Sequence, residues 1–236
     1  DAGLTESTTG TVTLAGSIDS TNDDITFGAI TLATATTVDT NASDTTGDII
    51  IGAVTGANNS LTLDTTTSTG SADITFNGDI NLGSGALNVT GDVVLGANVT
   101  VSGDGIIFSD AVNADNATNN DRTLTLNSSR ASSGGSPSIA FSGAVGNSQA
   151  LAGLTITQSN GTNFLSTVDV SDSNSGTITL TDTQDNKDIF FFGDVTADTF
   201  VTAAQGYDIF FNGDATFANA VTFQNTGTLD LGNATS

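Results

Sequence analysis

The sequence predicts an all-β protein, most simply a parallel β-helix, and three observations support this. Val, Ile, Thr and Phe dominate the chain, whereas Glu6 and Lys187 are its only glutamate and lysine, so strand formers outweigh helix formers. Apolar and polar residues alternate in short runs bounded by Gly, Asn, Asp or Ser, which is typical of strands with one buried face. A short motif also recurs, with several gaps of about 20 to 25 residues, the length of one coil in a solenoid.

The recurring motif is an Asp or small polar residue, two apolar residues flanking a variable one, then a Gly-containing corner and another apolar residue. Its clearest copies are residues 73–80 (DITFNGDI), 208–215 (DIFFNGDA) and 188–195 (DIFFFGDV). Shorter or looser copies follow the same order at 24–30, 48–54, 92–97, 106–112 and 138–145. Each copy predicts one strand followed by a tight turn, because Gly and Asn tolerate the backbone conformations of corners.

Further alternating runs between the copies predict the other strands of each coil. They lie at 61–63, 87–89, 99–101, 124–126, 154–157, 177–180 and 221–223. Pro137 is the only proline, which suits a fold whose strands pair on both sides. About ten coils at ~4.8 Å each would form a rod on the order of 50 Å long.

Stacked coils place like residues above like. The motif carries a phenylalanine at the same place in several copies, and these side chains are predicted to form one internal ladder: Phe27, Phe76, Phe141 and Phe211. An alternative remains open, in which the strands form antiparallel β-sandwiches in tandem. Three Asn-Gly dipeptides favour it, because Asn-Gly is a good hairpin turn: Asn77-Gly78, Asn160-Gly161 and Asn212-Gly213.

Four segments resemble the β-strand repeats of large bacterial surface exoproteins of the filamentous-haemagglutinin-like and autotransporter-passenger group. They are residues 139–146 (IAFSGAVG), 151–157 (LAGLTIT), 193–200 (GDVTADTF) and 227–232 (GTLDLG). The resemblance extends over most of the chain but is compositional and degenerate. It implies a right-handed parallel β-helix, secretion, and a role in adhesion, matrix or surface fibres, and it carries no catalytic residues to transfer.

The composition excludes several classes of function. The chain of 236 residues has no His or Cys, so it cannot build a Ser-His-Asp triad, a cysteine nucleophile or an ordinary zinc site. Three basic and 26 acidic residues give a net charge of −23. We therefore expect neither nucleic-acid binding nor binding to an anionic membrane, since both need clustered Lys and Arg.

Catalysis has one candidate in the sequence. Asp23 and Asp24 are the only adjacent carboxylates, and carboxylate pairs hydrolyse glycosides in many enzymes. The pair precedes a predicted strand, where a solvated corner is the simpler interpretation. We therefore expect no enzyme, with a carbohydrate-binding or carbohydrate-cleaving β-helix as the alternative.

Calcium binding is a further prediction, because Asp and Asn oxygens suit hard cations. Counter-ions would also relieve the self-repulsion of an acidic rod. The alternative is that these residues form ordinary corners, since Asp and Asn hydrogen-bond nearby backbone. The candidate ligands lie in four loops: Asp19, Asp23, Asp24, Asp115, Asp121, Asp169, Asp172, Asn174, Asp182, Asp185 and Asp188.

Two aromatic residues are candidates for a lateral contact. Phe190 and Phe210 occupy the motif position at which Thr75 stands in another copy. If the residues on either side of them face inward, these two rings face outward about one coil apart, and exposed apolar patches usually mark contacts.

We expect residues 1–236 to form one continuous β-helix segment. Both ends of the sequence resemble the middle of such a helix and lack a polar cap. The function that follows is a structural segment or subunit of a secreted surface fibre or adhesin, which self-associates end to end and contacts host or matrix glycans or proteins. The second alternative is a tandem β-sandwich adhesin made rigid by calcium.

Overall fold

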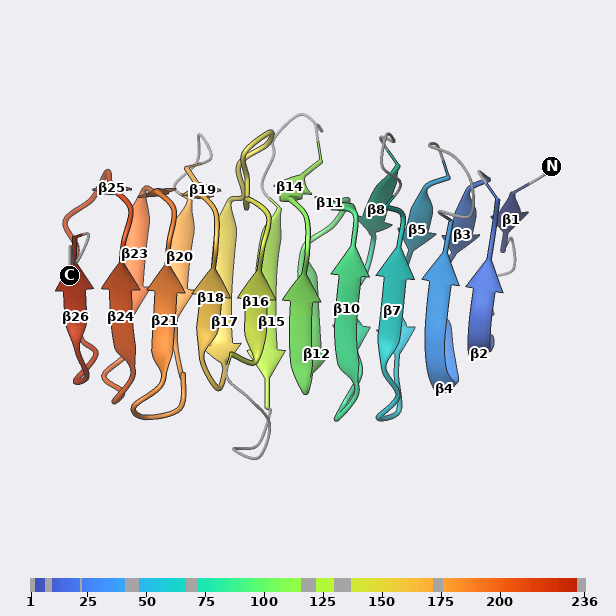
Figure 1. The fold of residues 1–236 in the computed structure, drawn as a ribbon, viewed down its shortest axis with the longest axis horizontal. Coiled ribbons are helices and arrows are strands. Elements are labelled where there is room, and N and C mark those ends of the chain that lie inside the picture. Colours follow the sequence, from blue (N-terminus) through green and yellow to red (C-terminus); the bar gives the residue numbers. More distant parts are fainter. Residues whose placement is uncertain are drawn as a thin grey trace.

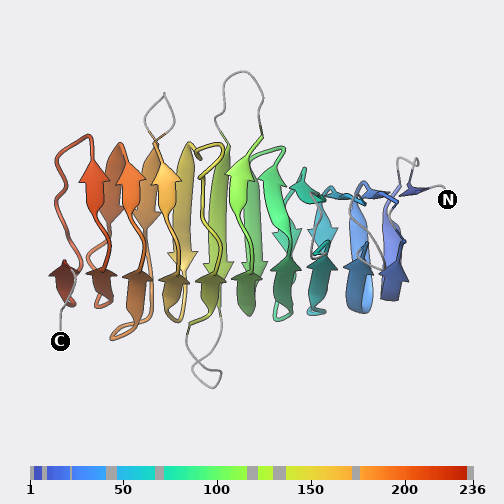
Figure 2. The same ribbon diagram turned by 45° about the horizontal axis from the view of Figure 1, so that its top comes forward.

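The computed structural model is a right-handed parallel β-helix (Figure 1). The structure describes residues 3–6, 10–21, 23–40, 47–66, 72–115, 122–129, 137–171 and 176–232, and these contain strands but no helix. Strands nearest the viewer in Figure 1 point upward, those behind them point downward, and the chain advances from right to left, which defines the hand. Each coil contributes a strand to up to three parallel stacks, which the turned view of Figure 2 separates.

The first stack begins each coil and contains most copies of the motif in the N-terminal half. An isolated pairing of Val145 with Val112 and Val168 joins its two parts. Its strands are β1 (Leu4–Thr5), β3 (Ile25–Phe27), β5 (Ile49–Ile51), β8 (Asp73–Phe76), β11 (Asp92–Leu95), β14 (Val112–Ala114), β19 (Val168–Val170), β22 (Val195–Ala197) and β25 (Ala215–Phe217).

The second stack follows in each coil. It begins with the N-terminal parts of two long strands, β2 (Val12–Asp19) and β4 (Ile30–Asp39), whose pairing shifts register between Leu14 and Gly16. It continues with β6 (Val54–Thr55), β9 (Ile80–Asn81), β12 (Val99–Gly103), β15 (Thr123–Ser128), β17 (Gly153–Gln158), β20 (Thr177–Leu180) and β23 (Thr199–Thr202).

The third stack completes each coil and forms the front face in Figure 1. It begins with the C-terminal parts of β2 and β4. It continues with β7 (Leu61–Asp64), β10 (Ala86–Thr90), β13 (Gly105–Phe108), β16 (Ile139–Phe141), β18 (Thr162–Phe164), β21 (Asp188–Phe191), β24 (Asp208–Phe211) and β26 (Leu229–Leu231).

The parallel pairing overturns the antiparallel sandwich alternative. Asn77-Gly78, Asn160-Gly161 and Asn212-Gly213 follow strands at corners, and the chain continues to the next stack rather than folding back. The run at 221–223 also differs from its prediction, because it forms no strand beside β23. Instead, the backbone N–H of Gln224, the residue after this run, donates to the side-chain hydroxyl of Thr202 at 2.6 Å.

The four predicted ladder phenylalanines are all buried, but they do not form one ladder. Phe27 and Phe76 lie in the first stack, where Ile51 separates them. Phe141 and Phe211 lie in the third stack. The prediction of a single ladder is wrong because copies of the same motif lie in two different stacks of the β-helix.

An uninterrupted aromatic ladder does form within the third stack. Phe108, Phe141, Phe164, Phe191 and Phe211 are consecutive, with ring centroids 4.8 to 5.0 Å apart and interplanar angles of 16° or less. These spacings match the separation of hydrogen-bonded strands, so each ring packs directly on the ring of the next coil. The ladder therefore follows from the parallel register rather than from local sequence.

Glycine in the turn that follows the strand of the motif lets neighbouring coils approach closely, at more than one corner of the β-helix. A Cβ added to Gly52 would lie 2.6 Å from the carbonyl oxygen of Gly28, and one added to Gly213 would lie 2.5 Å from the carbonyl carbon of Gly193. Side chains cannot occupy such positions without moving backbone. The Gly of the motif is therefore needed for contact between coils.

Candidate functional site

Acidic residues at the corners accept hydrogen bonds from backbone amides of the neighbouring coil. In the first stack, Asp24 Oδ1 accepts from the Asp48 N–H at 2.9 Å, and Asp48 Oδ1 accepts from the Asp73 N–H at 2.9 Å. These bonds link successive coils at a place where the regular strand pairing begins. The carboxylates thus satisfy amides that a corner would leave without a partner.

The same arrangement recurs in later coils. Asp194, just before the first-stack strand β22, accepts from the Asp214 N–H through Oδ1 at 2.9 Å, and Asp208, at the start of the third-stack strand β24, accepts from the Thr228 N–H. Asp79 does the same for Thr100 at 2.7 Å at another corner. The short aspartate side chain holds its carboxylate close to the backbone, which accounts for the preference for Asp over Glu.

The predicted calcium ligands are dispersed among these corners. Within the described part of the chain, no three acidic side chains come together in a group that could hold a metal ion. Asp24 and Asp185 accept backbone amides of the next coil, Asp19 accepts the Ser17 hydroxyl, and Asp169 accepts the Ser171 amide.

The other calcium candidates have different surroundings. Asp115 forms an ion pair of 2.8 Å with Arg122. Asp188 lies beside Asp208 in the pairing of β21 with β24. Asp23 and Asp182 are described, but no ligand group forms around them. Asp121, Asp172 and Asn174 lie outside the described residues.

Two aspartates at the start of motif copies have pKa values above the ordinary value of an aspartate. Burial, and then the nearby charges of Asp48 and Asp92, raise the pKa of Asp73 above its ordinary value. Burial and the charge of Asp208 likewise raise the pKa of Asp188, although Lys187 opposes this. Parallel stacking places like charges one coil apart, so ionising these two carboxyls opposes folding.

The lateral-contact candidates lie together on the outer face of the third stack. Phe190 and Phe210 pair in register, and their ring centroids are 4.6 Å apart at an interplanar angle of 21°. Phe192 adds a third ring 5.4 Å from Phe190. It is 43% exposed, and Leu165, on the neighbouring coil, is 50% exposed.

This ring geometry bears on the carbohydrate alternative. A sugar ring stacks on a free aromatic face, but the Phe190 ring stacks on two neighbouring rings. The rings therefore cover part of one another's faces. The arrangement suits a contact with other side chains better than a flat platform for a sugar.

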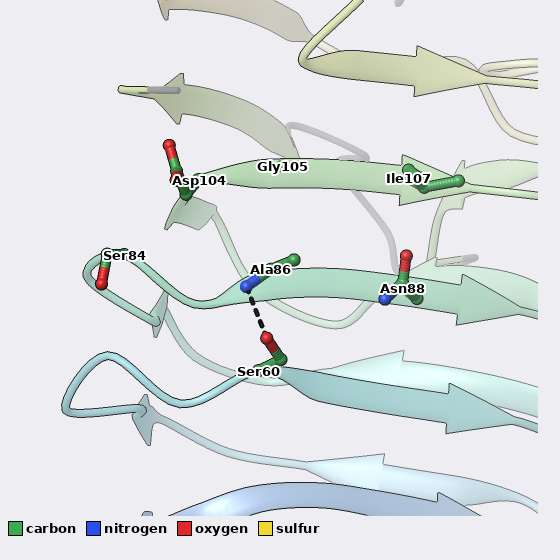
Figure 3. A pocket seen from close by; sticks show the side chains of 7 residues that line it. All are labelled: Ser60, Ser84, Ala86, Asn88, Asp104, Gly105 and Ile107. Carbon is green, nitrogen blue, oxygen red and sulfur yellow. Dashed lines mark hydrogen bonds between the residues drawn. The ribbon is translucent and has the colours of Figure 1, made fainter. Parts of the chain in front are cut away.

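Surface depressions elsewhere are shallow. One of about 290 Å³ lies on the third stack where Ala86 and Gly105 leave space between larger neighbours (Figure 3). Its polar wall includes Ser60, whose hydroxyl accepts from the Ala86 N–H at 3.0 Å, and Asp104. Another of about 340 Å³ contains Asp73 and Asp92 beside the segment with Ser148, whose N–H donates to Asn113 at 2.9 Å.

The coil that contains β25 and β26 has a strand partner on one side only among the described residues. Phe217, Phe223 and Leu229 pack against the core but are only half-buried, and Leu231 is 61% exposed. Phe217, Phe223 and Leu231 line a hollow of about 350 Å³ that reaches the last ring of the aromatic ladder, Phe211.

The described fold and corners define a parallel β-helix whose coils are joined through strands and carboxylates. No family model, curated protein or solved structure matches the chain. No helix in the described residues has the length and apolar character needed to cross a membrane.

Proposed function

We propose that this chain is a structural segment of a secreted bacterial surface fibre or adhesin, in which β-helix coils stack end to end. The observation that carries the proposal is the open side of the coil formed by β25 and β26. Its strand edges and half-buried apolar side chains match the surface that every internal coil buries against its neighbour. A further coil, supplied by the same polypeptide or by a second copy, would continue the first and third stacks, which end at β25 and β26 among the described residues.

The chemistry of the surface supports a mechanical role. Backbone pairing and buried ladders hold the rod together, and its 26 acidic residues keep the exterior hydrated. Aspartate bonds between coils add connections along the axis at the corners. The proposed function needs this continuity and no reactive side chain.

The test is the assembly state of the purified chain and of a variant with two charges on the open side, Phe223→Asp combined with Leu231→Asp. We expect the chain to form rods longer than one molecule in electron microscopy, and the variant to remain short. Far-UV circular dichroism establishes that the variant is folded. Leu165→Asp is the control, because Leu165 is exposed on the side of the rod rather than at its open coil.

A chain that stays a single short rod at high concentration would contradict stacking of copies. Rods that form equally well with both charges present would show that contact is made elsewhere. Either result would remove the open coil as the basis of the proposal.

A further inference from the structure

The apolar residues on the outer face of the third stack form a continuous strip, which we call the aromatic strip: Leu165, Phe190, Phe192 and Phe210. Phe190 and Phe210 are directly paired between β21 and β24. Leu165 and Phe192 occupy equivalent positions, since their amides donate to Phe141 and Phe164, which are themselves paired. The strip therefore crosses three neighbouring coils.

The fold does not require aromatic residues at these positions. Outward residues at the same register of the third stack are polar in several other coils, including Thr62, Asn88 and Asn163, and none of the others is aromatic. At the central outward position of the motif, the copy at 73–80 has Thr75 where the copy at 208–215 has Phe210. Thr forms strands as well as Phe does, so the half-buried outward rings of Phe190 and Phe210, together with the exposed Phe192 and Leu165, indicate a contact surface.

Carboxylates border the aromatic strip. Asp188 and Asp208 lie on the same outer face, two residues before Phe190 and Phe210. Asp230 pairs directly with Phe210 in β26. Asp194 and Asp214 follow at the next corner, joined by the bond between the Asp214 amide and the Asp194 carboxylate. Lys187 is the cation adjacent to this border in the described chain.

This charge arrangement selects the kind of partner. A second copy would bring the same carboxylates against the strip and a net charge of −23 for each molecule, which opposes lateral pairing. A polypeptide segment with apolar side chains flanked by Arg or Lys would cover the rings and pair with the bordering carboxylates. Contacts of this kind combine desolvated aromatic residues with complementary charge.

We propose that the aromatic strip binds a cationic, apolar segment of another protein. The strip supplies the apolar contact, and Asp188, Asp208 and Asp230 supply the charge complementarity. Binding involves the side of the rod and does not depend on end-to-end stacking. The small area of the strip gives a weak site, which repeats along a fibre and can therefore act multivalently.

The experiment measures binding of a labelled synthetic peptide in which Arg alternates with Leu, by fluorescence anisotropy at physiological salt. The test variant is Phe190→Thr combined with Phe210→Thr, which installs the residue found at position 75 in the matched motif. We expect this variant to bind the peptide at least about tenfold more weakly. Ile107→Thr is the matched control, because Ile107 is 41% exposed in the same stack but outside the strip, and we expect it to bind as the unaltered chain does.

Two further peptides separate charge from apolar contact. A peptide alternating Arg with Ser should bind weakly and equally to the chain and to the Thr variant, and one alternating Glu with Leu should not bind. Asp188→Asn combined with Asp230→Asn should weaken binding of the Arg–Leu peptide and reduce its salt dependence. Should the double Thr variant fail to fold, Phe192→Thr tests the same strip at a more exposed ring.

If the double Thr variant loses as much affinity for the Arg–Ser peptide as for the Arg–Leu peptide, the proposal is overturned, because the rings would then make no specific contact with the Leu side chains. Unchanged binding by the Thr variants would also overturn it. If sedimentation shows that the chain pairs laterally with itself and that Phe190→Thr with Phe210→Thr abolishes the pairing, the occupant is a second copy and the proposed cationic partner is wrong.

Discussion

Residues 24–97 and residues 105–217 use the same motif in different stacks of the β-helix. In the first region, the copies at 24–30, 48–54, 73–80 and 92–97 contribute strands to the first stack. In the second, the copies beginning near 106, 139, 189 and 209 contribute strands to the third stack. The motif specifies a strand and a tight corner, and it leaves open which face that strand occupies.

The large core residues move with the motif. Where the first stack has Phe76, the third stack of the same coil has Val89, both buried. Where the third stack has Phe191 or Phe211, the first stack has Val170 or Ala197. The interior of each coil has limited volume, so a large side chain on one face requires a smaller one on another. Side-chain volume is therefore balanced within a coil, while like residues stack between coils.

The largest expected effect comes from breaking this balance. Phe191→Ala should lower the free energy of unfolding by about 3–5 kcal/mol, because it removes a ring stacked on both sides in the ladder. Leu63 lies at the same register of the third stack, in a coil whose inward residue there is aliphatic. Leu63→Ala should lower the free energy of unfolding by about 2–5 kcal/mol. Chemical denaturation of each variant measures the difference.

The balance is tested by adding Val170→Phe to the Phe191→Ala variant. Val170→Phe alone should destabilise by about 1–3 kcal/mol through overpacking. In the double variant the new ring enters a coil that has lost one, so the combined cost should be smaller than the sum of the single costs. Purely additive costs would show that volume is not shared across the coil.

A second prediction concerns the corner glycines of the two regions. Gly52→Ala and Gly213→Ala should each destabilise by about 1–3 kcal/mol, because the new Cβ would meet backbone atoms of the preceding coil at 2.6 and 2.5 Å. Gly28→Ala is the control, since its Cβ would meet only the flexible Glu6 carboxylate at 3.1 Å. Thermal unfolding should rank Gly28→Ala well above the other two, and equal melting temperatures would argue against close approach at these corners.

A third prediction concerns the carboxylates that accept amides of the next coil. Asp48→Ala and Asp194→Ala each leave one backbone amide without its acceptor and should cost about 0.5–1.5 kcal/mol. Asp48→Asn and Asp194→Asn retain a side-chain carbonyl oxygen and should recover most of this loss. If Asn and Ala variants unfold at the same denaturant concentration, these hydrogen bonds do not stabilise the rod.

The smallest expected effect concerns the two aspartates whose pKa is raised. Because the folded state disfavours their ionisation, the charged forms of Asp73 and Asp188 cost stability at neutral pH. Asp73→Asn and Asp188→Asn should therefore raise stability at pH 7 by roughly 0.2–1 kcal/mol, the range for cross-strand charge pairs. The gain should shrink as pH falls through the raised folded-state pKa, and it should vanish below the ordinary aspartate pKa of the unfolded chain, where the carboxyl is neutral in both states.

Thermal melts across acidic to neutral pH check this dependence. Asp104→Asn serves as the control, because it removes one negative charge at a corner that belongs to neither set of stacked aspartates, the one around Asp73 or the one around Asp188. A gain at pH 7 that is the same for all three variants would reflect the overall charge of the molecule rather than the stacking of particular carboxylates.

Most strands could be predicted because their alternation is local. Inward residues such as Ile74, Phe76 and Ile209 are separated by single outward residues, and all three are buried. The outward position of Phe190 follows from the same spacing, and its stacking on Phe210 from the spacing of the motif copies. The long strands β2 and β4 were not foreseen, because each passes from the second stack to the third through a bulge that local alternation does not predict.

The corner aspartates show the limit of sequence reasoning about sites. The acidic residues that gather near Asp24 and Asp185 in the sequence predict both as calcium ligands. The structure instead turns their carboxylates toward amides about one coil away, at Asp48 and Gly206. The signal that could have found this was the repeat itself, since Asp24, Asp48 and Asp73 recur at the spacing of one coil.

The sequence by itself determined that this protein is all-β, that its strands are short and one-sided, and that Asp, Asn and Gly form its corners. These properties depend on side chains only a few residues apart. The tertiary structure alone decided which face each motif occupies, that Phe27 and Phe211 belong to different stacks, and which amide each carboxylate accepts. Those features depend on the register between coils, which is set by segments of unequal length and by the requirement that every coil fill the same interior volume.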